Sequence, residues 1–337
     1  MNKPILEVEN LHTVFHTSTG DVAAIEGVSF TVNEGEILGV IGESGSGKSV
    51  TSLSIMRLLK KGKTTVRNDS KILFEGKDLL KLNDSEIRKI RGKQISMIFQ
   101  DPLTSLNPVY TIGKQIEEVL RLHRGLSPKE INSEIIRILT LVGISSPEKR
   151  LKQYPHQLSG GMRQRVMIAM ALSCQPKLLI ADEPTTALDV TIQAQILELI
   201  KELRLTLNLS IMLITHDMGV IADMADRVVV MYSGKIVESG PVEEIFKDPK
   251  HPYTKGLLHS IPRLNHEEKR LNTIGGSIPN PNTRPAGCNY SPRCPHAMEK
   301  CKTIEPPKTT FEQGRSASCW LYENEVNYSL QNQPIKI

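Results

Sequence analysis

The sequence predicts an α/β fold in which helices cover both faces of a parallel β-sheet. Three apolar runs, at residues 178–181, 211–214 and 228–231, have the continuous hydrophobicity of parallel strands that are buried on both faces. A fourth run, residues 37–41, ends at a glycine-rich loop, and apolar residues at helical spacing follow that loop. Strand, loop and helix in this order open many α/β units, so we expect the fourth run to join the sheet.

The other elements follow from local pattern. Short apolar runs between turn residues predict strands at residues 5–8, 22–25 and 28–32. Apolar residues at helical spacing predict helices at residues 49–59, over much of 102–174, and at 191–205. After Asp248 the chain has many prolines, four cysteines and little helical periodicity. We therefore expect one large domain over residues 1–248, with a helical subdomain at about 102–174, and a small cysteine-rich module over residues 249–337.

Composition excludes several classes of protein. The chain has 337 residues, of which 39% are hydrophobic and 23% charged, as is ordinary for a globular protein. The net charge of +5 gives no case for nucleic acid, and the basic stretch at residues 60–67 is expected to be solvated. The first residues lack the apolar centre of a signal peptide, and no apolar run approaches the roughly 18 residues of a transmembrane helix. We expect a cytosolic protein that meets a membrane only through a partner.

Residues 42–49, Gly-Glu-Ser-Gly-Ser-Gly-Lys-Ser, match the phosphate-binding pattern G-x-x-x-x-G-K-[ST] in full. The glycines allow backbone N–H groups to surround phosphates, and the helix N-terminus adds a positive dipole end. Lys48 is expected to contact the β- and γ-phosphates of ATP, and Ser49 to bind Mg²⁺ through its hydroxyl. The residues expected to bind the nucleotide here are Gly42, Ser44, Gly45, Ser46, Gly47, Lys48 and Ser49.

Two carboxylates, Asp182 and Glu183, come directly after the apolar run at residues 178–181. Asp182 is expected to hold Mg²⁺, as an acidic residue does in P-loop NTPases. Glu183 is then placed to polarise the attacking water as a general base. Together with the phosphate-binding loop, this pair predicts a P-loop NTPase that hydrolyses ATP.

Residues 158–164, Leu-Ser-Gly-Gly-Met-Arg-Gln, resemble the LSGGQ signature of ABC ATPases, with Met162 where glutamine is usual. Physically the segment is a second helix start with anion-binding N–H groups. In ABC proteins this loop faces the γ-phosphate bound to the partner subunit, so the resemblance implies that Ser159, Gly160 and Gly161 complete a partner's site. It also implies that residues 1–248 form an ABC ATPase domain, with an antiparallel β subdomain and a helical subdomain beside the parallel sheet.

Further positions resemble ABC motifs one by one. Gln100 resembles the Q-loop glutamine, which senses Mg²⁺ and the transporter, and His216 resembles the switch histidine that contacts the γ-phosphate. Residues 187–189 resemble the D-loop, which crosses the dimer interface. Phe15 is expected to stack on adenine, as an aromatic residue does in this family, or else to be a core residue. Cys174 is interpreted as a buried packing residue.

Three segments narrow the resemblance to the D-type ATPase subunit of bacterial oligopeptide and dipeptide importers, namely residues 99–108, 251–258 and 287–295. This implies ATP hydrolysis that powers peptide import, at the cytoplasmic face of the cell membrane. The implied partners are a second ATPase subunit (an F-type paralogue or a second copy), two transmembrane permease subunits and an extracellular or periplasmic solute-binding protein. Close relatives import nickel or other small solutes, so the solute itself stays open.

Four cysteines, Cys288, Cys294, Cys301 and Cys319, are concentrated near the end of the sequence. Four thiolates suit a 4Fe–4S cluster, whereas zinc sites usually include ligands two to four residues apart, a spacing that is absent here. The subfamily resemblance implies a 4Fe–4S cluster; zinc and free thiols are the alternatives. We expect the order of this segment to depend on bound metal. ATP binding is expected to be independent of it, because every nucleotide motif precedes Arg227.

Two other classes of function compete with transport. One is an ABC ATPase of nucleic-acid repair or translation, but this sequence has one cassette, no sustained heptads and only mild basicity. The other is an iron–sulfur electron carrier with an incidental phosphate-binding loop. The complete set of hydrolysis motifs speaks against that class.

Overall fold

The computed structural model describes residues 3–101, 105–186, 188–260 and 274–323. Contacts divide the chain into two compact units, and each is described by itself. The first unit comprises Met1–Leu6, Thr31–Ile37 and Leu73–Ile214, and the second comprises Glu7–Phe30, Leu38–Ile72 and Thr215–Ile337. Neither unit ends at residue 248, so the domain boundary expected there stays a prediction.

The first unit contains three parallel strands in the order β9, β8, β7. Their bounds are Ile95–Ile98 for β7, Leu178–Asp182 for β8 and Ser210–Thr215 for β9. Leu178 lies opposite Ile95 on one side and opposite Ser210 on the other. Every residue of β8 and β9 is buried, as expected for parallel strands that are covered on both faces.

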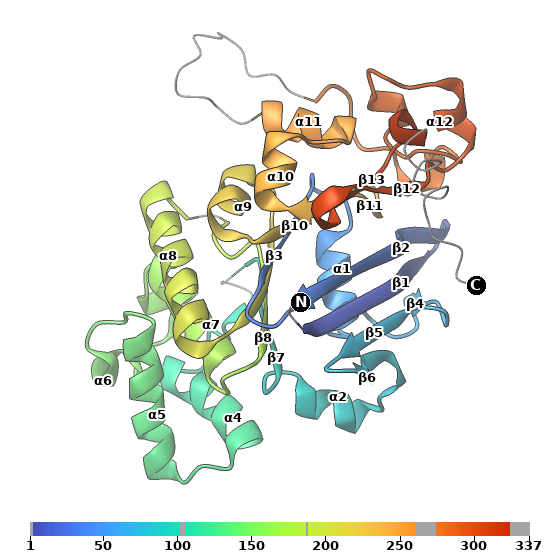
Figure 1. Ribbon diagram of the computed structural model, residues 1–337. Coiled ribbons are helices and arrows are strands. Elements are labelled where there is room, and N and C mark those ends of the chain that lie inside the picture. The colour runs from blue at the N-terminus through green and yellow to red at the C-terminus, as the bar shows by residue number, and fades with distance from the viewer. Residues whose placement is uncertain (1–2, 102–104, 187, 261–273, 324–337) are drawn as a thin grey trace, which may run out of the picture. The chain divides into compact units, whose positions relative to one another are not determined.

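Helices α4, α5, α6 and α7 lie between residues 112 and 172 of the first unit, which confirms the mainly helical segment predicted before residue 174 (Figure 1). The helix bounds in this unit are Asp84–Ile90 for α2, Ile112–Arg124 for α4, Pro128–Leu141 for α5, Pro147–Arg150 for α6, Gly160–Leu172 for α7 and Val190–Leu207 for α8. Helices α4, α5 and α7 pack against one another. Helix α5 starts with a capping box, in which Ser127 N–H donates to Glu130 at 2.8 Å and the Ser127 hydroxyl accepts from Glu130 N–H. Cys174 is half-buried rather than fully buried.

The second unit contains a sheet in the order β12, β13, β11, β10, β3. The bounds are Ile37–Ile41 for β3, Arg227–Tyr232 for β10, Lys235–Pro241 for β11, Lys308–Thr310 for β12 and Ser316–Ser318 for β13. Strand β3 pairs with β10 in parallel, and the other pairings are antiparallel. Two strands of the cysteine-rich segment therefore extend the sheet that carries β3.

The N-terminal strands differ from the prediction. Strands β1 (Pro4–Thr17) and β2 (Gly20–Asn33) are long, and the runs expected at 22–25 and 28–32 are one strand. Gly27 lies between the two predicted runs and takes a φ of 69° inside β2 without ending the strand, a conformation that glycine adopts without strain. The shorter strands are β4 (Thr64–Val66), which pairs antiparallel with β1, and β5 (Lys71–Phe74), which pairs antiparallel with β6 (Lys77–Asp78).

Short helices complete the second unit: α1 (Lys48–Ile55), α9 (Met218–Met224), α10 (Val242–Lys247), α11 (Pro252–His259) and α12 (Glu299–Thr303). Helix α1 is shorter than predicted, because Arg57 adopts a left-handed φ of 49° that cannot continue a helix.

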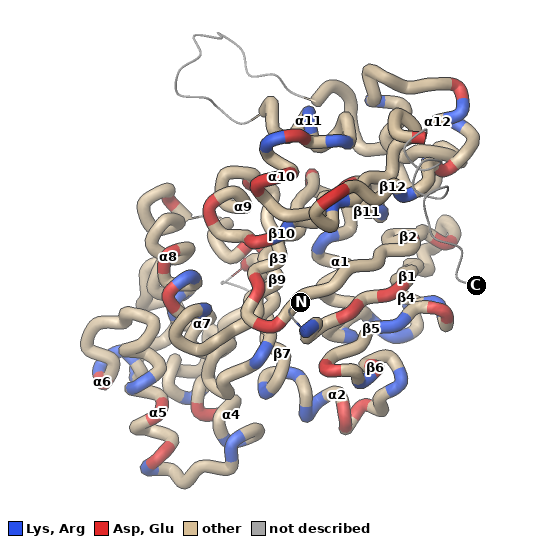
Figure 2. Tube along the Cα trace, viewed as in Figure 1, with Lys and Arg blue, Asp and Glu red and all other residues tan. Residues whose placement is uncertain are grey.

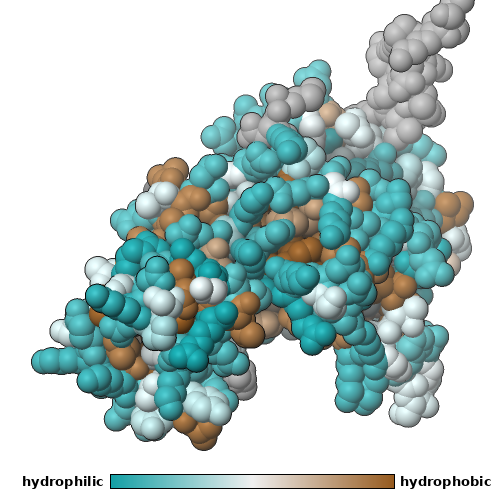
Figure 3. Space-filling view, turned by 90° about the horizontal axis from the view of Figure 1, so that it is seen from below, coloured by the Kyte–Doolittle hydropathy of each residue, from teal (hydrophilic) through white to brown (hydrophobic). Residues whose placement is uncertain are grey.

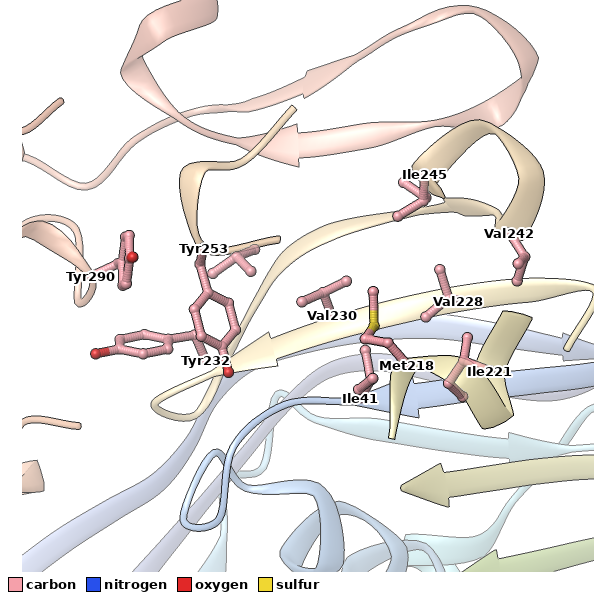
Figure 4. Packing of buried hydrophobic residues seen from close by; sticks show 11 residues of the cluster. Ile41, Met218, Ile221, Val228, Val230, Tyr232, Val242, Ile245, Tyr253 and Tyr290 are labelled. Carbon is pink, nitrogen blue, oxygen red and sulfur yellow. The ribbon is translucent and has the colours of Figure 1, made fainter. Parts of the chain in front are cut away.

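A hydrophobic cluster joins early and late parts of the second unit (Figure 4). Ile41 of β3 and Val230 of β10 belong to it, as do Tyr253 and Tyr290 from the segment after residue 248. Tyr232 lies beside both of these tyrosines, with ring centroids 4.7 Å and 5.1 Å away and edge-to-face geometry. The late segment therefore shares a core with β3 instead of forming one of its own.

Lys and Arg are interspersed with Asp and Glu along the described chain (Figure 2). Lys60, Lys61 and Lys63 of the basic stretch are exposed, as predicted. On the face shown in Figure 3, hydrophobic residues form separate small patches among hydrophilic ones. None of the described helices is both long and apolar enough to cross a membrane.

Glu238 of β11 anchors the start of α11. Its carboxylate, 1% exposed, accepts from the N–H groups of Lys250 and His251 at 2.7 and 2.8 Å. Burial raises the pKa of Glu238 and lowers the pKa of the buried His251 to about 3, so the His251 ring is neutral and its Nδ1 accepts from Tyr253 N–H.

We expect Glu238→Ala to lower the free energy of unfolding by about 2–4 kcal/mol, because it leaves two backbone N–H groups without their acceptor. Urea denaturation measures this. The exposed Glu202→Ala, on α8, serves as the control and should stay within about 0.5 kcal/mol of the parent. A loss no larger than the control's would contradict this role for Glu238.

Candidate nucleotide site

The predicted phosphate-binding loop leaves β3 and enters α1. The Lys48 side chain turns back into the loop, where its ammonium donates to the carbonyls of Gly42 and Glu43 at 2.6 and 3.0 Å. Lys48 is only 5% exposed, so its positive charge lies inside the loop and not in solvent. Ser44 and Gly45 are exposed, which leaves the outer rim of the loop accessible to an anion.

At two positions of the loop, neighbouring atoms lie too close for any residue with a Cβ, so glycine is required. A Cβ on Gly42 would lie 2.2 Å from the Met231 carbonyl oxygen, and one on Gly47 would lie 2.6 Å from Ile25 Cδ1. Gly47 also has a φ of 103°, which side chains rarely adopt. The glycine spacing of the motif therefore has a packing cause as well as a phosphate-binding one.

Residues beyond 248 contact this loop, although the expectation that ATP binding does not depend on the cysteine-rich segment stays a prediction. The Tyr253 hydroxyl accepts from Glu43 N–H at 2.9 Å. The Arg293 guanidinium pairs with both carboxylate oxygens of Glu43, at 2.6 and 3.1 Å. Neither contact was predicted, although both residues lie in segments that suggested the importer subfamily.

In the first unit the structure brings Gln100 and Glu183 together. Gln100 Nε2 donates to Glu183 Oε2 at 2.9 Å, and the Thr186 hydroxyl donates to the same oxygen at 2.9 Å. Glu183 has a φ of 46°, and its N–H donates to the Ile214 carbonyl at 2.8 Å. Asp182, at the end of β8, is 4% exposed. The contact of Thr186 with Glu183 had no signal in the sequence.

The signature segment opens α7, as predicted. The Ser159 hydroxyl caps the helix by accepting from Met162 N–H at 3.4 Å, and Ser159 and Gly160 are exposed. A Cβ on Gly161 would lie 2.7 Å from Ile192 Cγ2, so glycine is needed there for packing. In the D-loop, Asp189 caps α8 through Ile192 N–H, whereas Ala187 lies outside the described residues.

His216 and Phe15 belong to the second unit. His216 follows β9 and is exposed. Phe15 lies on β1 opposite Thr64 of β4 and is half-buried, which leaves part of its ring accessible. Stacking of Phe15 on adenine stays a prediction.

The four late cysteines, Cys288, Cys294, Cys301 and Cys319, line one small cavity. Burial, together with the charges of the other three cysteines, raises the pKa of the Cys288 thiol to about 11. Burial likewise raises the pKa of Cys294 and Cys319. Four thiolates around one cavity would repel one another unless a cation compensated them, so the donor set fits a metal centre by its chemistry. Among the described side chains, however, no three His, Cys, Asp or Glu are close enough together to hold a metal ion.

Two family comparisons cover much of the sequence. Residues 25–186 match the ABC transporter family. Residues 237–301 match the C-terminal region of oligopeptide/dipeptide transporters, a stretch that contains Tyr253 and Arg293.

Curated relatives are similar over nearly their whole length. The chain is 54% identical to the oligopeptide transport ATP-binding protein AppD of Bacillus subtilis, covering 95% of this chain and 98% of that one. It is 52% identical to the dipeptide transport ATP-binding protein DppD of the same organism, covering 97% of each. It is 51% identical to the oligopeptide transport ATP-binding protein OppD of Haemophilus influenzae, covering 96% and 99%.

Solved structures share the fold. The ATP-binding cassette MJ0796, a dimer in a post-hydrolysis state bound to ADP and Pi, matches with a TM-score of 0.63 and 28% identity over 70% of this chain and 98% of that one. CbiO1 from Clostridium perfringens, part of an ABC transporter complex, matches with a TM-score of 0.62 and 29% identity over 73% and 92%.

We expect Gly42→Ala to weaken ATP binding at least about tenfold, because the added methyl group must displace the loop from Met231. Titration calorimetry measures the dissociation constant. The matched control is Gly62→Ala, since Gly62 has a φ of 78° but a Cβ there would meet no heavy atom within 4 Å. That variant should bind ATP within about twofold of the parent, and equal affinity in both variants would count against the packing argument.

Proposed function

Because the chain belongs to the oligopeptide/dipeptide group of ABC transporter ATP-binding proteins, we propose that it hydrolyses Mg-ATP to power the import of peptides across the cell membrane. Members of this family are ATPases coupled to transport, and so is this chain. The observation that carries the proposal is the phosphate-binding loop, in which the buried Lys48 ammonium lies among backbone groups at the start of a helix.

We propose these roles at the nucleotide. Lys48 and the loop N–H groups bind the β- and γ-phosphates, and His216 contacts the γ-phosphate. Ser49, Asp182 and Gln100 would hold Mg²⁺, which neutralises charge on the phosphates when bound. Glu183 orients and deprotonates the attacking water. The hydrogen bonds from Gln100 and Thr186 to Glu183 Oε2 support this role, because they fix the orientation of the carboxylate.

We propose that Ser159, Gly160 and Gly161 complete the nucleotide site of a partner subunit. The exposed start of α7 supports this, since its N–H groups are available to an anion outside their own chain. The dimeric state of the solved ATP-binding cassette is a further support. The partner is a related F-type subunit or a second copy.

The same proposal places the chain at the cytoplasmic face of the membrane, as a peripheral subunit bound to two permease subunits that receive peptide from a solute-binding protein. Exposed apolar side chains near Gln100 in sequence support a contact with a permease. Phe99 is 39% exposed, Val109 70% and Tyr110 49%.

We propose that Cys288, Cys294, Cys301 and Cys319 bind a 4Fe–4S cluster, with zinc as the alternative. Their shared cavity supports this, and so does the burial of Cys301 and Cys319. When bound, the cluster would supply the positive charge that four thiolates need. It would also link Cys301 of α12 and Cys319, which directly follows β13, with Cys288 and Cys294. Its proposed contribution is structural.

We expect Lys48→Ala to abolish measurable Mg-ATP binding, because the phosphates lose their main countercharge. Glu183→Gln should bind Mg-ATP normally but hydrolyse it about 10²–10⁴-fold more slowly in the assembled transporter. Calorimetry and phosphate release measure the two effects. Near-normal turnover in Glu183→Gln would remove that residue from the role of general base.

Anaerobically purified protein is expected to contain iron and sulfide in equal amounts, with an oxygen-sensitive brown colour. Serine in place of any one of the four late cysteines should lower the iron content, whereas Cys174→Ser should leave it unchanged. Metal and sulfide analysis decides the matter. Zinc without iron would refute the cluster, and no metal at all would refute the metal centre.

A further inference from the structure

Glu43, the second residue of the phosphate-binding loop, is held at two points. Its N–H donates to the Tyr253 hydroxyl at 2.9 Å, which fixes the backbone. Its carboxylate accepts two hydrogen bonds from Arg293, at 2.6 and 3.1 Å, which fix the side chain. A bidentate pair of this kind specifies orientation as well as distance.

Arg293 is itself held rigidly. Its side chain is only 4% exposed. Nε donates to the Gly275 carbonyl at 2.8 Å and Nη2 donates to the Ile274 carbonyl at 3.2 Å. The guanidinium also lies 5.8 Å from the centre of the Tyr232 ring. The guanidinium is planar, and a single rotamer makes all of these contacts at once. Arg293 is therefore a rigid support for Glu43.

Tyr253 is supported in a different way. It is fully buried, and its ring packs against Tyr232 and Tyr290 at centroid distances of 4.7 and 5.4 Å (Figure 4). Its backbone N–H donates a hydrogen bond to Nδ1 of His251, at the start of α11. The hydroxyl that receives Glu43 N–H is thus fixed by an aromatic core.

A third group of contacts braces the turn that holds Ser46. Gly234 N–H donates to the Ser46 carbonyl at 2.9 Å. The preceding residue, Ser233, is bound by Arg284, whose Nε donates to its hydroxyl at 2.9 Å, and by Asn289, which donates to its carbonyl at 2.9 Å. The loop is therefore braced at Glu43 and at Ser46 by residues that come much later in the sequence.

We infer that Arg293 is a positioning residue for the phosphate-binding loop, acting through Glu43. The inference rests on the proposed nucleotide site and adds a residue to it. The guanidinium and the Glu43 carboxylate neutralise each other, so Arg293 contributes a fixed backbone geometry more than net attraction for phosphate. A preorganised loop binds anions more tightly, because less conformational freedom is lost on binding. Without Arg293, the Glu43 carboxylate would also stand uncompensated beside the phosphates and repel them.

Arg293→Met in the full-length chain is expected to weaken Mg-ATP binding about tenfold or more, measured by calorimetry. Arg293→Lys, which restores the charge but not the fork, should recover part of that loss. Adding Glu43→Gln to Arg293→Met should also recover part of it, because the repelling charge is removed. In the assembled transporter, KM for ATP should rise while kcat at saturating ATP stays within about twofold, a separation that general destabilisation would not give.

The matched control is Arg315→Met. Arg315 lies in the same late segment, has a side chain only 9% exposed and pairs with Glu244 at 3.5 Å, but its described contacts do not include the loop. This variant should bind Mg-ATP within about twofold of the parent. Wild-type affinity in Arg293→Met would overturn the inference, and so would equal losses in the two arginine variants.

Two further measurements separate a failure of the inference from a failure of the proposed site. If Lys48→Ala binds Mg-ATP as tightly as the parent, the proposed nucleotide site fails and not the role of Arg293 alone. If Arg293→Met does not fold, Arg293→Lys and the single variant Glu43→Gln decide: unchanged affinity in both overturns the inference, and weaker binding in Arg293→Lys supports it.

Discussion

The close approach of Gly42 to the Met231 carbonyl is the contact on which the proposed nucleotide site depends. Strands β3 and β10 pair in parallel, and β3 must turn into the loop directly beside the end of its neighbour. Only a residue without a Cβ can make that turn, because the Met231 oxygen occupies the space. Once the backbone has passed this point, the loop curls around the Lys48 ammonium and delivers the chain to the first turn of α1. The glycines of the motif are therefore required both by the packing of the strands and by phosphate binding.

The same constraint explains why residues far apart in sequence are needed to hold the loop. A glycine-rich loop is conformationally free, and that freedom must be removed before the N–H groups can face phosphates together. The loop has few side chains with which to brace itself, so the bracing comes from outside. Tyr253 and Arg293 fix Glu43, and Gly234 fixes Ser46. These contacts join residues that are far apart in sequence, so the finished geometry of the loop depends on the packing of the second unit.

Local pattern predicted the elements of this protein well and its long-range contacts poorly. The buried strands β8, β9 and β10 were predicted because short, unbroken apolar runs are typical of strands covered on both faces, and the G-x-x-x-x-G-K-[ST] loop because its spacing is specific. The two runs on either side of Gly27 were predicted as separate strands, because a glycine within a strand and a glycine in a turn have the same signal in sequence. The bond from Thr186 to Glu183 and the pair of Arg293 with Glu43 could not be predicted, because they depend on which side chains the fold brings together. The roles of the nucleotide-site residues remain predictions.

The position of Arg293 also connects the cysteines with the loop. Arg293 directly precedes Cys294, and Tyr290 follows Cys288 by two residues. Any group that held these thiols together would fix the backbone at both positions, and hence the guanidinium on Glu43 and the ring that packs against Tyr253. If the thiols were free, only the aromatic cluster and the hydrogen bonds of Asn289 and Arg293 would hold the same backbone in place. Since ordering a segment costs conformational entropy whichever interactions achieve it, a bound metal centre would lower the cost of preorganising the loop. The structural role proposed for the cysteine-rich segment therefore extends beyond its own stability to the geometry in which phosphate is bound.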